Sequence, residues 1–429
     1  MIKKLKSPDK VKFAWAFYDW ANSVYSLVIS TAIFPIYYES VTAGENTDQI
    51  EFLGHTFTNT ALYAYTMSLS FFIVALMSPL LSSIADASGK KKSFMKFFCY
   101  LGAVSCASLF FFEGPNLWLG LTASLFASIG FSGSLVFYNA FLPEIAPFEE
   151  QDSLSAKGFS LGYLGSTLLM VLNLLMIQKP EWFGMTNSPE DTKWMTRCVF
   201  LTVAVWWFLF SQYTFKHLPD NIHNLKVPKR YLFKGYKELA KVWKSLTDEP
   251  RIKRFLFAFF FYSVGVQTVI LLATLFGKKV LELESSQLII TILLIQVVAI
   301  GGSLLFSFLS KKMGNIKAIQ LAIFMWILIC FAAYFTQNAN QFYMIAGGVG
   351  LVLGGIQALS RSTFSKILPE TTNHATYFSF FDVTEKVSVM VGTLVFGMLE
   401  EISNNMRYSI LALGIFFIVG YIILYNFNV

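Results

Sequence analysis

The segment ADASGKKK (85–92) follows one long apolar run of the chain, and SKKMGNIK (310–317) follows another. The glycines of the two segments lie 225 positions apart. A second pair of landmarks, FLPE with Pro143 and ILPE with Pro369, is displaced by 226 positions. Two landmarks displaced by nearly the same distance indicate an internal repeat. The chain is therefore predicted to consist of two matching halves.

Apolar runs surround these landmarks, and each is close to the roughly 20 residues that a membrane-spanning helix needs. The runs lie at 13–38, 58–84, 94–112, 117–142, 158–178, 197–215, 254–276, 286–309, 317–335, 342–366, 376–399 and 406–427. Only 14% of the 429 residues are charged and the mean hydropathy is +0.56, whereas a soluble domain has roughly 25% charged residues. We predict an all-α integral membrane protein of about 12 transmembrane helices in two pseudo-symmetric six-helix halves.

The lysines and arginines predict how the chain is oriented in the membrane. Of the 33, only six lie in the loops of one side: Lys179, Lys193, Arg197, Lys278, Lys279 and Arg407. By the positive-inside rule both termini are cytoplasmic. The predicted domains are an N-terminal six-helix half at 1–215, a cytoplasmic linker at 216–253 and a C-terminal half at 254–429. We expect a multi-pass protein of the inner (plasma) membrane.

The linker contains an amphipathic pattern. Apolar residues recur at helical spacing, while lysines occupy another face. The apolar residues are Leu232, Tyr236, Leu239, Trp243 and Leu246. The pattern predicts a helix lying on the anionic cytoplasmic leaflet. A solvated linker helix is the alternative.

The sequence lacks the motifs that are typical of several classes of function. The four cysteines fall in apolar runs, no histidine lies in the middle of a span, and no GxxxxGK[ST] loop or GxSxG motif occurs. We expect no enzyme activity, no cofactor and no metal. The basic residues lie between spans, so we expect contact with the lipid bilayer and a small-molecule substrate rather than nucleic acid, and a monomer.

Polar residues in the first span form a stripe. Asp19, Asn22, Ser26 and Ser30 share one helix face, with Tyr25 beside it. This face is predicted to line a water-filled cavity, where Asp19 could exchange protons. Asp19 is also close enough to the cytoplasmic end to be a hydrated interfacial acid or the partner of a structural arginine, and the residues leave both interpretations open.

The eleventh span begins with charged residues. Asp382 and Lys386 are spaced to pair on one helix, which leaves Glu385 with less compensation. These residues are candidates for proton coupling or for a gate. The alternative is a structural ion-pair cluster that fixes this span against the tenth, through Arg361.

The tenth span carries Gln357 and Arg361 on one face. The planar guanidinium of Arg361 suits a carboxylate-bearing solute, and a gate ion pair is the alternative. Tyr138, Asn139 and Gln267 add polar groups to other spans. Together they predict a polar interior that could hold a small polar solute.

The loop after the second span resembles the signature of the major facilitator superfamily, Gly-x-x-x-Asp-x-x-Gly-basic. Asp86, Gly89 and Lys90 match, and Ser82 replaces the leading glycine. The resemblance implies the major facilitator fold, with a loop that couples helix movement to the cytoplasmic gate. In the second half Lys311 occupies the acidic position, which puts a charge relay there in doubt.

Further motifs are similar to the vacuole-effluxer-like branch of that superfamily. They are YDWANS (18–23), FYNAFLPEIAP (137–147), KGFSLGYLGS (157–166), GVQTVI (265–270) and GGIQALSRS (354–362). The eukaryotic members are autophagy-related and implicated in amino-acid export from the vacuole, and this chain looks like a bacterial member. Ser263-Val264 stands where many relatives carry an Asn-Asp pair, which removes one acidic candidate.

These observations predict a secondary transporter of a small polar organic solute, an amino acid or related metabolite, coupled to protons. A transporter of lipid, lysolipid or another amphiphile is the alternative within the same class. A membrane receptor that does not transport is the alternative from a different class.

Overall fold

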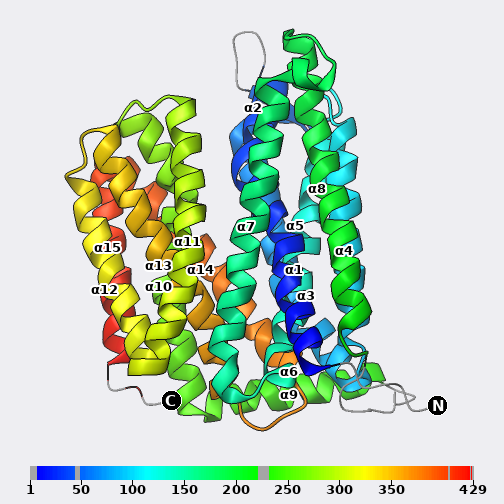
Figure 1. The fold of residues 1–429 in the computed structure, drawn as a ribbon, viewed down its shortest axis with the longest axis vertical. Coiled ribbons are helices and arrows are strands. Elements are labelled where there is room, and N and C mark those ends of the chain that lie inside the picture. The colour runs from blue at the N-terminus through cyan, green and yellow to red at the C-terminus, as the bar shows by residue number, and fades with distance from the viewer. Residues whose placement is uncertain (1–6, 44–48, 221–230, 404–405, 426, 428–429) are drawn as a thin grey trace. The chain divides into compact units, whose positions relative to one another are not determined.

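The computed structural model describes residues 7–43, 49–220, 231–403, 406–425 and 427, and they are almost entirely helical (Figure 1). Up to residue 217 the elements are α1 Pro8–Val24, the π-helix Tyr25–Ile33, α2 Phe34–Thr42, β1 Gln49–Phe52, β2 His55–Thr58, α3 Asn59–Ser88, α4 Lys91–Ser108, α5 Leu117–Ala140, α6 Leu142–Ile145, α7 Gln151–Gln178 and α8 Pro189–His217, with short 3-10 turns at Leu109–Phe111, Phe148–Glu150 and Pro180–Phe183. Later elements are α9 Tyr231–Asp248, α10 Pro250–Val280, α11 Ser285–Met313, α12 Asn315–Tyr334, α13 Ala339–Ile367, α14 His374–Ser403 and α15 Met406–Leu424.

Eleven helical stretches among the described residues are long and apolar enough to cross a membrane. A twelfth predicted span corresponds to α14, a 30-residue helix that carries Asp382, Glu385 and Lys386. Each of the twelve predicted apolar runs thus falls within or overlaps one long helical stretch. The prediction of an all-α membrane protein with about twelve spanning helices is confirmed.

Helix starts are marked by residues that satisfy the free backbone N–H groups of the first turn. Ser188 accepts a hydrogen bond from the Asp191 N–H at the start of α8. Asn338 does the same for the Gln341 N–H at the start of α13. Glu284 opens α11 with a reciprocal capping box. These caps help to determine the residues at which α8, α11 and α13 begin.

The first spanning segment is not a uniform α-helix. Its middle, Tyr25–Ile33, is a π-helix, and α2 resumes just before Pro35. A proline has no N–H to donate, so a preceding carbonyl loses its usual partner. The Thr31 hydroxyl donates to the Ser26 carbonyl at 2.8 Å, five residues back. The change of helix type begins three residues after Asn22, and such insertions are frequent at functional sites.

A short hairpin occupies part of the predicted loop between the first two spans. Strands β1 and β2 pair in antiparallel register, with Phe52 opposite His55. Leu53 and Gly54 both have positive φ, 53° and 76°, as a two-residue hairpin turn requires. The apolar patterns did not predict this hairpin, because each strand has only four residues.

The chain forms two compact units, which differ from the two sequence halves. Unit 1 contains Met1–Ser78, Lys90–Tyr138 and Gly165–Asn221, and unit 2 contains Pro79–Gly89, Asn139–Leu164 and Ile222–Val429. Unit 2 therefore includes the end of α3 and the start of α7, although both belong to the first half of the sequence. The division at 216–253 predicted from the sequence stays a prediction.

Candidate functional site

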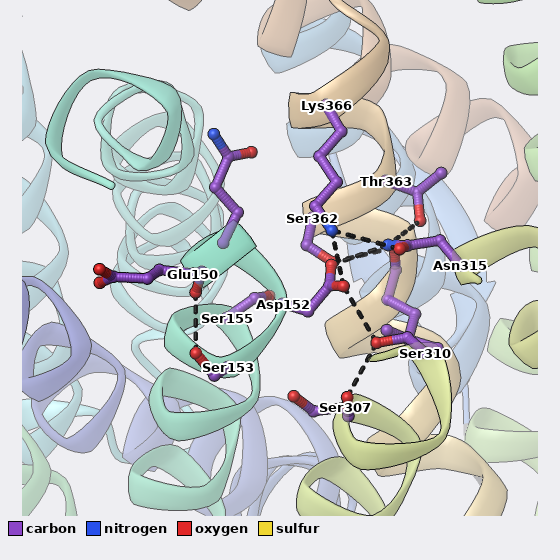
Figure 2. Close-up of polar contacts among 12 residues, drawn as sticks. Glu150, Asp152, Ser153, Ser155, Ser307, Ser310, Asn315, Ser362, Thr363 and Lys366 are labelled. Carbon is purple, nitrogen blue, oxygen red and sulfur yellow. Dashed lines mark hydrogen bonds and ion pairs between the residues drawn. The ribbon is translucent and has the colours of Figure 1, made fainter. Parts of the chain in front are cut away.

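A buried polar network in unit 2 connects α7 with α11, α12 and α13 (Figure 2). Asp152, in the first turn of α7, accepts from Lys366 Nζ at 2.6 Å and from Asn315 Nδ2 at 2.7 Å. The Ser310 hydroxyl donates to the same carboxylate at 3.0 Å, and Asn315 also reaches Thr363. We call these five residues the Asp152 network.

The Asp152 network joins the first half of the sequence to the second. Asp152 belongs to the first half and the other four members to the second. The side chains of Lys366 and Asp152 are only 5% and 4% exposed. Removing one partner of a buried ion pair costs about 3–5 kcal/mol, because the other charge stays buried. The network is therefore a strong tie at the helix ends expected to face the cytoplasm.

Asp86, at the end of α3, makes a second connection between the halves within unit 2. Its carboxylate accepts from the Ala375 and Thr376 N–H groups, at 3.2 and 2.8 Å, and from the Thr376 hydroxyl at 2.8 Å. Asp86 thereby caps the first turn of α14 and stabilises its positive dipole end. Of the other predicted loop residues, Gly89 has φ +68° and Lys90 is exposed.

The Asp86 cap and the Asp152 network are related by the internal repeat. Asp86 and Ser310 are 224 positions apart, and so are Asp152 and Thr376. Each contact therefore joins nearly equivalent positions of the repeat, whose landmarks are displaced by 225 and 226 positions, but the carboxylate has changed sides. In the Asp86 cap the carboxylate lies at the end of one helix, α3, and contacts the start of α14. In the Asp152 network the carboxylate lies at the start of a helix, α7, and contacts the end of α11. Lys311 takes the acidic position of the loop motif, 225 positions after Asp86, but the neighbouring Ser310 still has an acidic partner in Asp152.

Replacing Asp86 by alanine is expected to weaken the start of α14. Three buried donors would lose their acceptor, and an unsatisfied buried polar group costs about 1–3 kcal/mol. The apparent melting temperature of the purified protein should fall, with Asp86→Asn falling less because it keeps one acceptor oxygen. Lys90→Ala is the matched control on the same loop. Equal melting temperatures for Asp86→Ala and Lys90→Ala would contradict the role of the cap.

Arg361 is buried in unit 2 and its guanidinium is engaged by protein groups. Nε donates to the Ser155 hydroxyl at 2.9 Å and Nη2 to the Ser155 carbonyl at 2.8 Å. Nη1 lies 3.4 Å from Asn139 Oδ1, and the group sits 4.2 Å from the centre of the Phe159 ring. Through these contacts Arg361 connects α13 with α5 and α7. One helical turn earlier, Gln357 Oε1 accepts from the Tyr163 hydroxyl at 2.5 Å.

The predicted charged residues of α14 form a cluster with Gln267 of α10, which we call the mid-helix cluster. Lys386 Nζ lies 3.6 Å from Asp382 and 3.8 Å from Glu385. Gln267 Nε2 donates to Glu385 Oε1 at 2.6 Å. Asp382 and Lys386 are buried, whereas the Glu385 side chain is 28% exposed. The cluster thus connects α14 with α10 through the hydrogen bond between Gln267 and Glu385.

The first-span candidates lie in unit 1. The Tyr138 hydroxyl donates to Asp19 Oδ2 at 2.8 Å, so two predicted residues from different spans are in contact. The ring of Trp15 stacks on Tyr138 at 4.5 Å, and its Nε1 donates to the Tyr138 carbonyl. Asn22 is buried, and its Nδ2 donates to no described residue. Tyr25 packs in an aromatic cluster, 5.0 Å from the nearest ring centre.

Sequence reasoning missed one further buried polar pair in unit 2. Glu144 Oε1 lies 2.9 Å from His374 Nδ1, with 1% and 11% of their side chains exposed. Glu144 belongs to the FLPE landmark, which indicates the internal repeat. The landmark's acidic residue could have indicated an interaction, because a buried carboxylate needs a partner.

Solved structures with the same arrangement of helices are those of membrane transporters. The proton:xylose symporter XylE has a TM-score of 0.75 at 12% identity, covering 98% of this chain and 95% of that one. The E. coli fucose:proton symporter FucP has a TM-score of 0.69 at 15% identity, covering 98% of each chain. These likenesses show that the chain has the major facilitator fold.

Sequence comparisons identify the branch. The model of the "Vacuole effluxer Atg22 like" family matches residues 8–429. The uncharacterized MFS-type transporter YxiO of Bacillus subtilis is 33% identical over 98% of this chain and 95% of its own length. Autophagy-related protein 22 of Saccharomyces cerevisiae (strain S288c) is 24% identical over 81% of this chain and 74% of its own. The chain belongs to the vacuole effluxer Atg22-like family, as its motifs predicted.

Proposed function

We propose that the chain is a secondary transporter that moves a small polar organic solute by alternating access and couples this movement to protons. Amino acids are the substrate class to test first. The Asp152 network, the Asp86 cap and Arg361 form the gate at the end expected to face the cytoplasm. Opening at this end requires these contacts between the sequence halves to break.

The observation that carries proton coupling is the charge of the mid-helix cluster. Two carboxylates and one ammonium group leave a formal charge of −1 near the middle of a spanning helix. Glu385 lies about 16 Å along α14 from its first residue, at a rise of ~1.5 Å per residue. An ionised group at the centre of a spanning helix costs about 2.5–3.5 kcal/mol. A single proton neutralises the cluster and removes that cost.

Glu385 is the member of the cluster best placed to take this proton. It is more exposed than Asp382 and Lys386, and it accepts a hydrogen bond from Gln267 of another helix. Proton binding at Glu385 weakens its attraction to Lys386 and changes the contact between α10 and α14. Protonation and helix movement are coupled through that contact. XylE and FucP are proton symporters, and their likeness to this chain supports the fold alone.

The experiment is uptake by proteoliposomes under an imposed pH gradient, with a pool of radiolabelled standard amino acids as probe. The wild type is expected to accumulate label above the level reached without a gradient. Glu385→Gln should bring accumulation down to that level while exchange without a gradient persists. Glu181→Gln, an exposed carboxylate in a loop, is the matched control, and Asp19→Asn tests the second predicted proton site.

Two results would overturn separate parts of this proposal. If Glu385→Gln and Asp19→Asn both retain gradient-driven accumulation, neither predicted acid couples transport to protons. If the wild type neither accumulates nor exchanges any labelled amino acid, the substrate class is wrong.

A second candidate substrate is an amphiphile, which an apolar cavity in unit 2 favours. The cavity has about 540 Å³ of space not filled by atoms, part of it open to the surroundings. It is lined by residues such as Phe276, Phe342, Phe396, Ile345 and Leu413, and none of the lining residues is charged. Such a lining suits an alkyl chain better than a zwitterion. Stabilisation of the purified protein by lysophosphatidylcholine but not by amino acids would favour this candidate.

A further inference from the structure

The linker helix α9 contacts helix ends from both halves of the sequence, all within unit 2. On the α3 side, the Ser83 hydroxyl donates to the Gly235 carbonyl. Gly235 itself lies against Ile84, and a Cβ built at Gly235 would be 2.9 Å from Ile84 Cγ1 and 3.3 Å from its backbone. The approach is close because Gly235 has no side chain. A larger residue here would act as a wedge.

Three contacts of α9 with α14 and the residue before it lie along one face of α14. Asn373 Nδ2 donates to Glu238 Oε2 at 3.1 Å, just before α14 begins. The Tyr377 hydroxyl donates to Ser245 Oγ at 2.8 Å. The rings of Phe380 and Trp243 are 5.6 Å apart. Positions 373, 377 and 380 have the spacing of a single helix face, so α9 packs along the start of α14.

The face of α9 that makes these contacts is the side opposite its lysines. Val242 and Leu246 are buried, 2% and 7% exposed, while Lys237 and Lys241 are exposed on the other side. Leu246 was expected to face the lipid leaflet and is instead buried in protein. The structure does not describe the side chains of Leu232 and Tyr236. Part of the amphipathic pattern therefore serves contacts within the chain, whereas Trp243 is 60% exposed.

These contacts surround the Asp86 cap. Ser83 and Ile84 lie three and two residues before Asp86 along α3, and Asn373 and Tyr377 flank the residues that Asp86 caps. We propose that α9 is a clamp across the gate: it holds the end of α3 and the start of α14 together, and this end opens only when α9 releases one of them. The inference rests on the gate of the proposed function but requires neither a particular substrate nor proton coupling.

As a clamp, the linker helix α9 would control the separation of α3 from α14 in addition to joining the two halves of the sequence. Separation of α3 from α14 would break the Asp86 cap and pull Gly235 from Ile84 or Ser245 from Tyr377. The described contacts of α9 with α3 and with α14 are hydrogen bonds and ring contacts, and no buried ion pair occurs among them. Such contacts can form and break reversibly during transport.

The test uses labelling of a cysteine that is buried when this end is closed. Ser303 of α11 is fully buried, and its hydroxyl lies 2.7 Å from that of Ser160 of α7. Opening separates α7 from α11 and exposes position 303. Ser303→Cys, in a chain whose four native cysteines are replaced by alanine, is treated with a water-soluble maleimide in detergent. No substrate or gradient is needed, so failure here is distinguishable from failure of the transport proposal.

Gly235→Leu inserts the wedge and is expected to speed labelling of Ser303→Cys about tenfold, because a larger share of molecules is open. Ala240→Leu makes a change of similar size at an exposed position of α9, and it should label at the wild-type rate. A folded Gly235→Leu protein that labels no faster than Ala240→Leu would overturn the clamp. If Gly235→Leu does not fold, the milder pair Asn373→Ala with Tyr377→Phe replaces it, and unchanged labelling of that variant would also overturn the clamp.

Discussion

Replacing Lys366 by methionine is expected to shift the molecule strongly toward the form that is open at the end expected to face the cytoplasm. In the closed form Asp152 would stay buried with Ser310 and Asn315 as its remaining donors. Loss of one partner of a buried ion pair costs about 3–5 kcal/mol, and the two remaining hydrogen bonds place this case near the lower value. About 3 kcal/mol corresponds to a change of roughly a hundredfold in the open-to-closed ratio.

The penalty applies mainly to the closed form, because Asp152 becomes hydrated once α7 leaves the second half. Labelling of Ser303→Cys should therefore become much faster in Lys366→Met. Lys312→Met, an exposed lysine at the end of α11, and Ser153→Ala, whose hydroxyl donates to the Glu150 carbonyl outside the network (Figure 2), are the matched controls. Neither should change the labelling rate.

A double-mutant cycle separates the ion pair from a general loss of packing. Asp152→Asn combined with Lys366→Met leaves no uncompensated charge, and the amide introduced at position 152 still offers an acceptor oxygen. The double variant should label more slowly than Lys366→Met alone, because replacing both partners of a buried pair is often close to neutral. If the two effects simply add, Asp152 and Lys366 are not energetically coupled and the network is not a tie of the gate.

The spanning helices were predictable because the bilayer demands long apolar runs, and each run has a visible start and end. The pairing of Asp382 with Lys386 was predictable for a similar reason, since residues four apart on a helix are neighbours. The π-helix was not, because Tyr25–Ile33 is as apolar as a regular helix would be. The hairpin at 49–58 was too short to show a pattern.

Asp152 was missed because it lies six residues before the apolar run that was assigned to its span, and it therefore counted as a loop residue. Its partners come from three other helices, and hydropathy carries no information about such contacts. One signal was present in the sequence. The offset of 224 positions that separates Ser310 from Asp86 also separates Thr376 from Asp152. That shared offset could have indicated that Asp152 forms a contact equivalent to that of Asp86, with the acidic residue on the other helix of the pair.

Replacing Lys386 by methionine is expected to destabilise the protein at neutral pH and to make its stability depend on pH. The substitution changes the formal charge of the mid-helix cluster from −1 to −2, with Asp382 buried and one of its oxygens accepting no hydrogen bond from a described residue. The uncompensated carboxylates should cost about 3–5 kcal/mol. Protons relieve this cost, so the melting temperature of the variant should rise relative to wild type as the pH is lowered.

The control for this prediction restores the formal charge of the mid-helix cluster without restoring the ion pair between Asp382 and Lys386. Asp382→Asn combined with Lys386→Met returns the cluster to a formal charge of −1 and keeps Glu385 and Gln267 in place. The double variant should regain most of the stability at neutral pH, whereas Lys278→Met, an exposed lysine near the end of α10, should change nothing. Because Glu385 survives in the double variant, gradient-driven uptake should survive as well if Glu385 is the proton site. A stable double variant that has lost coupling would instead assign the proton to Asp382.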